Sequence, residues 1–173
     1  MSPIATSELL FELANRVDPA ANAPGSTPGA SAAAATTNAH QLRFFTLDFD
    51  QTTDESTAWQ FSFPANYSSG GTVYLKWFST PTSGNVVWKA SIYVATDGSS
   101  DLDTSSAYNA VDTATTAVPG TSGYLTSTSI ALTTPGIAAN KYCNVMVGRD
   151  ANNASDTAAG DARLLAVKFQ WTS

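Results

Sequence analysis

The chain has 173 residues, a length that suits one domain with an appendage. Its 14 acidic and 8 basic residues give a formal net charge of −6, and the basic residues are scattered singly, which argues against a nucleic-acid partner. No apolar run is long enough to span a membrane, and the N-terminus lacks the pattern of a signal peptide. We therefore expect a protein that is made in a cytoplasm and has neither nucleic acid nor membrane as a partner.

Residues 6–17 have the apolar spacing of a short amphipathic helix. Thr6 or Ser7 can cap such a helix, and the chain should leave it before Pro19. The apolar stripe consists of Leu9, Leu10, Leu13, Ala14 and Val17, with Phe11 beside it. A helix of about three turns is marginal alone in water. It must therefore pack either on its own domain or on a partner.

Residues 18–40 have low complexity and are rich in Ala, Pro and Gly. They offer little to bury, so the entropy of ordering them is not offset within the segment. The stretch is predicted to be a linker that could span on the order of 75 Å at ~3.3 Å per residue. The expected organisation is an N-terminal arm over 1–40, with the helix at 6–17, and a compact domain over 41–173.

Alternation with a period of two predicts three strands in the centre of the chain. They cover 59–63, 72–79 and 86–94, and Gly, Pro, Asn and Ser fill the connections between them. The other expected strands are 41–50, 124–132, 141–148 and 163–171, with an irregular stretch over 95–123. About eight short strands predict an all-β fold, an antiparallel β-sandwich or jelly roll, that carries the N-terminal helix-plus-linker arm.

Residues with catalytic potential are few. Cys143 is the only cysteine and lies in a strand pattern, where a free cysteine usually acts as a small buried hydrophobe. His40 is the only histidine and ends the predicted linker, where it cannot be held rigidly against a nucleophile. We expect no enzymatic activity, no metal and no cofactor.

Carboxylates cluster in two predicted loops, at 48–55 and at 97–103. Either cluster could offer oxygen ligands to Ca²⁺, but neither has the spacing of a calcium-binding loop, so roles in turns are favoured. A glycosidase pair needs no local motif, because its two carboxylates can face each other across a cleft. It stays a less favoured alternative.

Outward aromatic side chains could form a sugar-binding platform or an oligomer interface. By alternation the candidates are Tyr67, Tyr74, Phe78, Tyr93 and Tyr108. This is more aromatic surface than a monomer usually exposes. We therefore expect a homo-oligomer, with Tyr74, Phe78 and Tyr93 as interface candidates.

Four segments of the compact domain resemble a jelly-roll module that recurs in structural proteins of tailed bacteriophages. They are residues 58–67, 83–88, 147–157 and 161–168, and the likeness covers roughly 44–171. The last two segments flank a long polar loop with the charged pairs Arg149–Asp150 and Asp161–Arg163. Opposite charges at the two ends could pin the strand ends together and so order the loop, at no more than about 1 kcal/mol per partly exposed pair, or they could face a neighbouring subunit.

The resemblance implies a non-enzymatic virion structural protein. A short arm followed by one jelly roll looks like a capsid decoration (cement) protein, often a homotrimer, that binds the outside of a phage capsid and stabilises it. Its partner would be the major capsid protein, and its location the capsid surface after synthesis in the host cytoplasm. The expected anchor residues on the arm are Ile4, Leu9, Leu10, Phe11, Leu13 and Val17. The alternative is a tail- or fibre-associated jelly-roll module that binds host-surface carbohydrate.

Overall fold

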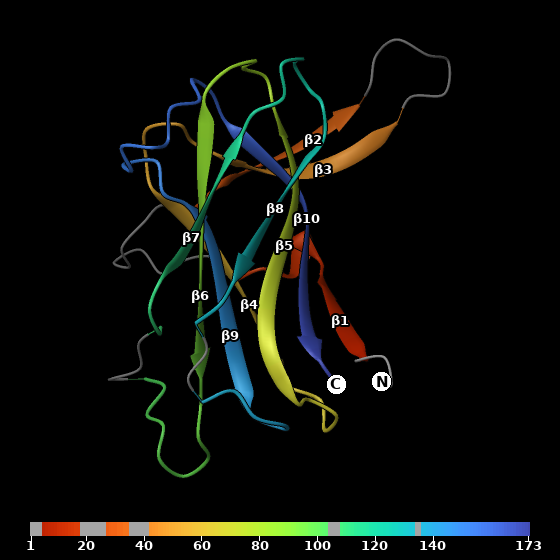
Figure 1. Ribbon diagram of the computed structural model, residues 1–173, viewed down its shortest axis with the longest axis vertical. Coiled ribbons are helices and arrows are strands. Elements are labelled where there is room, and N and C mark those ends of the chain that lie inside the picture. Colours follow the sequence, from red (N-terminus) through yellow and green to blue (C-terminus); the bar gives the residue numbers. More distant parts are fainter. Residues whose placement is uncertain (1–4, 18–26, 35–41, 104–107, 134–135) are drawn as a thin grey trace.

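A computed structural model describes residues 5–17, 27–34, 42–103, 108–133 and 136–173 (Figure 1). Side chains of residues 30–34 are not described. The elements in chain order are β1 (Thr6–Phe11), the 3-10 helix η1 (Leu13–Asn15), β2 (Gly29–Ala34), β3 (Arg43–Phe49), β4 (Glu55–Ser62), β5 (Ser69–Ser79), β6 (Asn85–Val94), β7 (Asp112–Ala117), β8 (Thr126–Ala131), β9 (Tyr142–Arg149) and β10 (Ala162–Thr172). No helix in these ranges is long and apolar enough to cross a membrane.

The strands form two antiparallel sheets that pack face to face. One sheet has the order β2-β3-β10-β5-β8, with β1 also paired to β10, and the other has the order β4-β9-β6-β7. From β3 onward the strands follow jelly-roll connectivity, since β3, β5, β8 and β10 lie in one sheet and β4, β6, β7 and β9 in the other. The predicted all-β antiparallel sandwich is confirmed.

The core lies between the sheets and takes side chains from both, among them those of the three predicted central strands, now β4, β5 and β6. Trp77 of β5 meets Trp88 of β6 across the sandwich at a ring-centroid distance of 5.7 Å, and Phe49 of β3 meets Trp88 at 5.1 Å. All three side chains are fully buried. The Trp77 indole donates a hydrogen bond to Thr128 Oγ1 at 2.9 Å, so its polar edge is satisfied.

The predicted helix over 6–17 is wrong. Residues Thr6–Phe11 form a strand whose six residues pair with β10, from Thr6 opposite Thr172 to Phe11 opposite Val167. Only Leu13–Asn15 is helical, as a single 3-10 turn. A strand satisfies the free edge of β10 and buries Phe11, whereas a three-turn helix would leave that edge open.

The arm is therefore not an appendage to the domain. Val17 continues it by exchanging backbone hydrogen bonds with Ala58 of β4, at 2.7 and 2.9 Å, and the Trp59 indole donates to the Glu12 carbonyl at 2.9 Å. Part of the predicted linker, Gly29–Ala34, is strand β2, paired with β3. Residues 18–26 and 35–41 lie outside the described ranges. The predicted boundary at residue 40 is corrected, because β1 and β2 belong to the same sheet as β3 and β10.

Two strands, β3 and β1, pair with different parts of the same edge of β10 and diverge from each other there. We call this divergence the fork. The β3 strand pairs with β10 at Ala162–Leu164, and β1 pairs with the same edge at Val167–Thr172. Leu165 and Ala166 lie between these two pairings, at a register shift of β10 against β5. The hairpin of β2 and β3 consequently diverges from the sandwich (Figure 1).

Candidate ligand-binding site

The outer face of the four-stranded sheet carries a group of tyrosine and amide side chains, which we call the tyrosine–amide patch. Register places Gln60 of β4 opposite Asn144 of β9, and Asn144 opposite Tyr93 of β6. Their chain neighbours Cys143, Val145 and Ile92 are fully buried, so alternation turns the patch residues outward. Tyr142, also on β9, and Tyr108, which precedes β7, complete the patch.

Two hydrogen bonds fix the patch. The Tyr108 hydroxyl donates to Asn144 Oδ1 at 2.7 Å, and the Tyr142 hydroxyl donates to Gln60 Oε1 at 2.9 Å. Because β6 lies between β9 and β7, the Tyr108 side chain must cross the outer face of β6 to reach Asn144. The rings of Tyr108 and Tyr142 are thereby held in one orientation by the side-chain amides of Asn144 and Gln60, respectively.

The backbone next to Tyr108 is also anchored. Asn109 N donates to the Ile92 carbonyl at 3.0 Å, and the buried Ser91 hydroxyl contacts the carbonyls of Asn109 and Ala110 at 2.8 and 3.1 Å. The tyrosine–amide patch is therefore preorganised, which lowers the entropy lost when a ligand binds.

The patch is uncharged at neutral pH. None of its five members is an acid or base that ionises near pH 7. Burial, followed by the nearby Tyr142, raises the pKa of Tyr108 to about 12. The surface offers aromatic faces, hydroxyl groups and amides, which suits a neutral polar ligand better than an anion or a cation.

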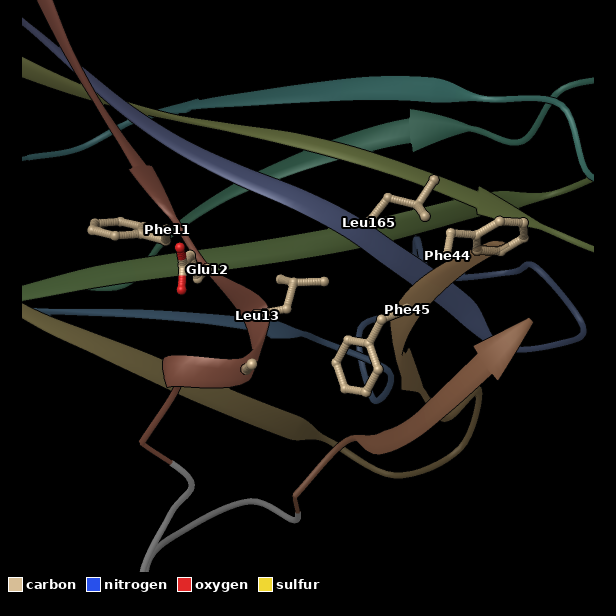
Figure 2. Close-up of a pocket in the computed structure, with 7 residues that line it drawn as sticks. Phe11, Glu12, Leu13, Phe44, Phe45 and Leu165 are labelled. Carbon is tan, nitrogen blue, oxygen red and sulfur yellow. The ribbon is translucent and has the colours of Figure 1, made fainter. Parts of the chain in front are cut away.

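The fork contains a concavity, which we call the fork pocket (Figure 2). It has a volume of about 470 Å³ and is mostly apolar. One side comes from β1 and η1, the other from β3, and Leu165 of β10 lies between them. The lining residues are Phe11, Glu12, Leu13, Ala14, Phe44, Phe45 and Leu165.

The fork pocket has little chemistry of its own. Its one ionisable group, Glu12, is exposed and accepts a hydrogen bond from Asn15 Nδ2 at 2.8 Å. The remaining side chains are aliphatic or aromatic, and Phe45 is 40% exposed. The pocket can bury an apolar group but cannot orient a polar ligand.

The predicted anchor residues do not form one exposed stripe. Phe11 and Leu13 are buried in the core of their own domain, and Leu9 packs against that core. Leu10 and Val17 are exposed, on 72% and 44% of their surface. Ile4 lies outside the described residues. The amphipathic helix expected to present these side chains to a capsid does not exist, because alternation in β1 sends Leu10 outward and Phe11 inward.

The predicted interface residues lie on opposite faces of the molecule. Tyr74 and Phe78 are on the outer face of β5, whereas Tyr93 is on the outer face of the other sheet. Lys168 Nζ lies 4.6 Å from the Tyr74 ring centroid, and the Arg163 guanidinium lies 5.8 Å from that of Phe78. One flat interface cannot use all three aromatic residues, and oligomerisation stays a prediction.

Tyr67 is not part of a platform. Its ring packs on Phe63 at a centroid distance of 4.7 Å, and its hydroxyl donates to the Gly70 carbonyl at 2.9 Å. Of the five platform candidates, Tyr93 and Tyr108 are brought together on one face. Gln60, Tyr142 and Asn144 were not predicted, since their place beside these tyrosines depends on strand register.

The first carboxylate cluster serves turns and ion pairs. Asp50 Oδ1 accepts from the Thr52 hydroxyl and from Thr52 N, both at 2.6 Å, and these contacts lower the pKa of Asp50. Asp54 pairs with Lys89 at 2.6 Å and accepts from Asn152 N at 3.1 Å. In the described parts of the chain, no three His, Cys, Asp or Glu side chains gather as a metal site.

Cys143 is fully buried on β9, as predicted, and desolvation raises its pKa to about 12. The thiol is therefore neutral and shielded from reagents. His40 lies outside the described residues.

Comparison with known proteins gives a structural likeness only. No family model matches the chain, and no curated protein matches it. A carbohydrate-binding module, TmCBM61, solved with β-1,4-galactotriose, is 13% identical with a TM-score of 0.37, over 99% of this chain and 90% of that one. The mannan-recognising module TmCBM27 is 12% identical with a TM-score of 0.38, over 96% and 99% of the two chains.

A third structure is from a study of promiscuous specificity in β-sandwich carbohydrate-binding modules. It is 8% identical with a TM-score of 0.41, over 91% of this chain and 56% of that one. Because all three TM-scores lie below 0.5, we base the functional proposal on the side chains of this chain.

Proposed function

We propose that this protein is a non-catalytic β-sandwich module that binds carbohydrate through the tyrosine–amide patch. The observation that carries the proposal is the pair of hydrogen bonds Tyr108–Asn144 and Tyr142–Gln60, within a patch of uncharged side chains on the outer face of the four-stranded sheet. The C–H face of a pyranose can stack on a tyrosine ring, while its hydroxyl groups need both donors and acceptors. Amides and phenols supply both.

Binding assays on single variants test this proposal. We expect Tyr108→Ala to weaken binding of any recognised glycan at least tenfold, the loss of about 1.4 kcal/mol. Tyr124→Ala is the matched control, because Tyr124 is 62% exposed and lies in the connection between β7 and β8, outside the patch. A glycan array followed by calorimetry gives the readout. Absence of any glycan ligand, or equal affinity of wild type and Tyr108→Ala, would contradict the proposal.

The fork pocket favours a second candidate function, attachment to a protein partner such as a phage capsid. It gathers two of the predicted anchor residues, Phe11 and Leu13, with Phe45 in one apolar depression. An apolar side chain of a partner could fill it. The resemblance to phage structural modules motivates the capsid as partner, and a trimer on the particle remains part of this candidate.

A charged substitution in the fork pocket distinguishes the two proposed functions, capsid attachment and glycan binding. Phe45→Asp should abolish binding to undecorated capsids and leave glycan binding unchanged, because the patch lies on the other sheet. Leu125→Asp adds the same charge at a side chain that is 59% exposed and does not line the pocket. Co-sedimentation with capsids measures the first property. Full capsid binding by Phe45→Asp would remove the fork pocket as the attachment site, and light scattering would report the oligomeric state.

A further inference from the structure

We propose that the tyrosine–amide patch prefers N-acetylated sugars and recognises their acetamido groups. This inference rests on the proposed carbohydrate-binding function and names the class of sugar. It follows from which polar atoms of the patch are already used.

Within the protein, the side-chain amides of Asn144 and Gln60 form hydrogen bonds through their oxygen acceptors and not through their N–H donors. Asn144 Oδ1 accepts the Tyr108 hydroxyl, and Gln60 Oε1 accepts the Tyr142 hydroxyl. Among the described residues, neither Asn144 Nδ2 nor Gln60 Nε2 has a partner. Each amide has two N–H donors and a carbonyl with two lone pairs, so its unused capacity is weighted toward donors.

An acetamido group complements this surplus. Its carbonyl oxygen accepts hydrogen bonds and has no proton to place, and amide N–H groups are suitable donors. Its methyl group needs apolar cover, which the adjacent tyrosine rings can supply. A plain hydroxyl at the same carbon brings one donor, as the acetamido N–H does, but it lacks both the carbonyl acceptor and the methyl group.

The uncharged character of the patch also argues against the free amino sugar. De-N-acetylation turns the acetamido group into an amine that is protonated at neutral pH. No carboxylate belongs to the patch, so such a cation would lose water without gaining a countercharge. Selection for the acetylated form thus has an attractive and a repulsive component.

The patch is wide enough for more than one sugar residue. Gln60, Asn144 and Tyr93 lie in one row across three adjacent strands. Neighbouring strands are spaced by ~4.8 Å, so the outer two members are roughly 10 Å apart. The two amides of this row are neighbours, about one strand spacing apart, so we expect both to donate to one acetamido group while Tyr93 contacts the next sugar of the chain.

Three ligands of equal length and β-1,4 linkage test the inference by calorimetry on the full chain. They are oligomers of N-acetylglucosamine, of glucose and of glucosamine. We expect the N-acetylated oligomer to bind at least tenfold more tightly than either of the others. Equal affinity for the three, or tighter binding of the glucose oligomer, would overturn this inference and leave the proposed function standing. Binding of none, with no ligand on a glycan array, would overturn both.

Two variants test whether the amide donors are responsible. Asn144→Asp and Gln60→Glu keep an oxygen acceptor for the tyrosine hydroxyl and lose the N–H donors. We expect each to reduce the preference for the N-acetylated over the glucose oligomer to about twofold or less. Gln51→Glu adds the same charge on an exposed side chain in the connection between β3 and β4 and should keep the full preference. An unchanged preference in Asn144→Asp and Gln60→Glu would contradict the assignment of the acetamido contacts to these residues.

Discussion

Arg149 and Asp156 form a bidentate ion pair that is almost completely shielded from solvent. Arg149 Nη2 lies 2.7 Å from Asp156 Oδ1, and Arg149 Nε lies 3.0 Å from Oδ2. The remaining guanidinium hydrogens point at the carbonyls of Phe49, Ala158 and Gly160, at 3.3, 3.0 and 2.8 Å. All five N–H donors of the arginine are therefore used, which a lysine could not reproduce.

This pairing differs from the one predicted from the sequence. The sequence predicts that opposite charges at the two ends of the long loop, in Arg149-Asp150 and Asp161-Arg163, pin the strand ends together as partly exposed pairs. Arg163 instead lies 3.8 Å from Asp48 of β3, while Arg149 reaches the carboxylate seven positions on.

The Arg149–Asp156 pair is expected to be essential for stability. Arg149→Met should lower the free energy of unfolding by about 3–5 kcal/mol, because it leaves a buried carboxylate without its countercharge. Lys89→Met removes one partner of a more exposed pair, with Asp54, and should cost at most about 1 kcal/mol. Urea unfolding followed by tryptophan fluorescence compares the two. Equal small losses would mean that water reaches the Arg149 site.

The segments that resemble a phage module meet around this ion pair. Val87 N donates to Asp156 Oδ2 at 2.8 Å, and the amides of Thr157 and Ala158 donate to the Asn85 carbonyl at 2.8 and 3.0 Å. Two of these segments, 83–88 and 147–157, thus form one structural unit that fastens the long loop to β6. The likeness therefore reports how the sandwich is held together, and it does not identify a binding site.

Gly84 gives a test of that fastening. Its φ is +96°, and a Cβ there would lie 2.6 Å from the Thr157 carbonyl oxygen. Gly84→Ala should therefore cost about 2 kcal/mol or more, from backbone strain and from displacement of the loop. Gly70→Ala is the matched control, with φ +75° and nothing within 4 Å of the added carbon. Thermal unfolding of both variants separates the two contributions. A Gly84→Ala loss no larger than that of Gly70→Ala would show that the loop yields without cost.

The core strands and the N-terminal arm show how much of the secondary structure the spacing of apolar residues can predict. Alternation over 59–94 predicts β4, β5 and β6, because apolar residues at every second position leave no competing helical stripe. In the arm, Leu9, Phe11 and Leu13 fit a strand, while Leu9, Leu10, Leu13 and Val17 fit a helix. The free edge of β10 decides between them, and that edge is a property of the assembled sheet.

The tyrosine–amide patch was predictable in part for the same reason. Outward positions of Tyr93 and Tyr108 follow from local pattern. Their neighbours Gln60 and Asn144 are recognisable only once β4, β9 and β6 are aligned, since a slip of one residue would turn Asn144 inward.

Phe11 tests the corrected role of the arm. Its ring stacks on Trp59 at a centroid distance of 5.4 Å and an interplanar angle of 6°. Phe11→Ala should cost about 3 kcal/mol of stability, as for other large aromatic truncations in cores. Leu10→Ala, one residue away and 72% exposed, should change stability by no more than about 0.5 kcal/mol. Equal effects in urea unfolding would contradict the strand assignment.

Removal of residues 1–17 is expected to destabilise the sandwich, contrary to the behaviour of a detachable arm. It would uncover Trp59 and the edge of β10 that pairs with β1. A lower unfolding temperature and a tendency to associate through the open edge should follow. Unchanged circular dichroism and an unchanged unfolding temperature in the truncated chain would support the original prediction that the arm is separate from the domain.

The Tyr108 hydroxyl links the stability of the patch to alkaline pH. Its pKa is raised from 10.0 in an unperturbed tyrosine to about 12, chiefly by burial. Because the folded-state pKa lies above the unfolded one, the contribution is complete below pH 10 and is lost as the pH rises toward 12. Tyr108→Phe cannot ionise there and should lose less stability over this window than wild type. Cys143 titrates in the same range in both proteins, so the difference isolates Tyr108.

Absorbance at 295 nm gives the direct measurement. The absorbance change missing from Tyr108→Phe should occur well above pH 10, in keeping with a Tyr108 pKa of about 12. If the absorbance lost in the variant titrates near pH 10, the hydroxyl is solvated and its bond to Asn144 does not hold in solution. The same result would remove the fixed amide orientation on which acetamido recognition depends, since a mobile Asn144 presents its carbonyl as readily as its N–H donors.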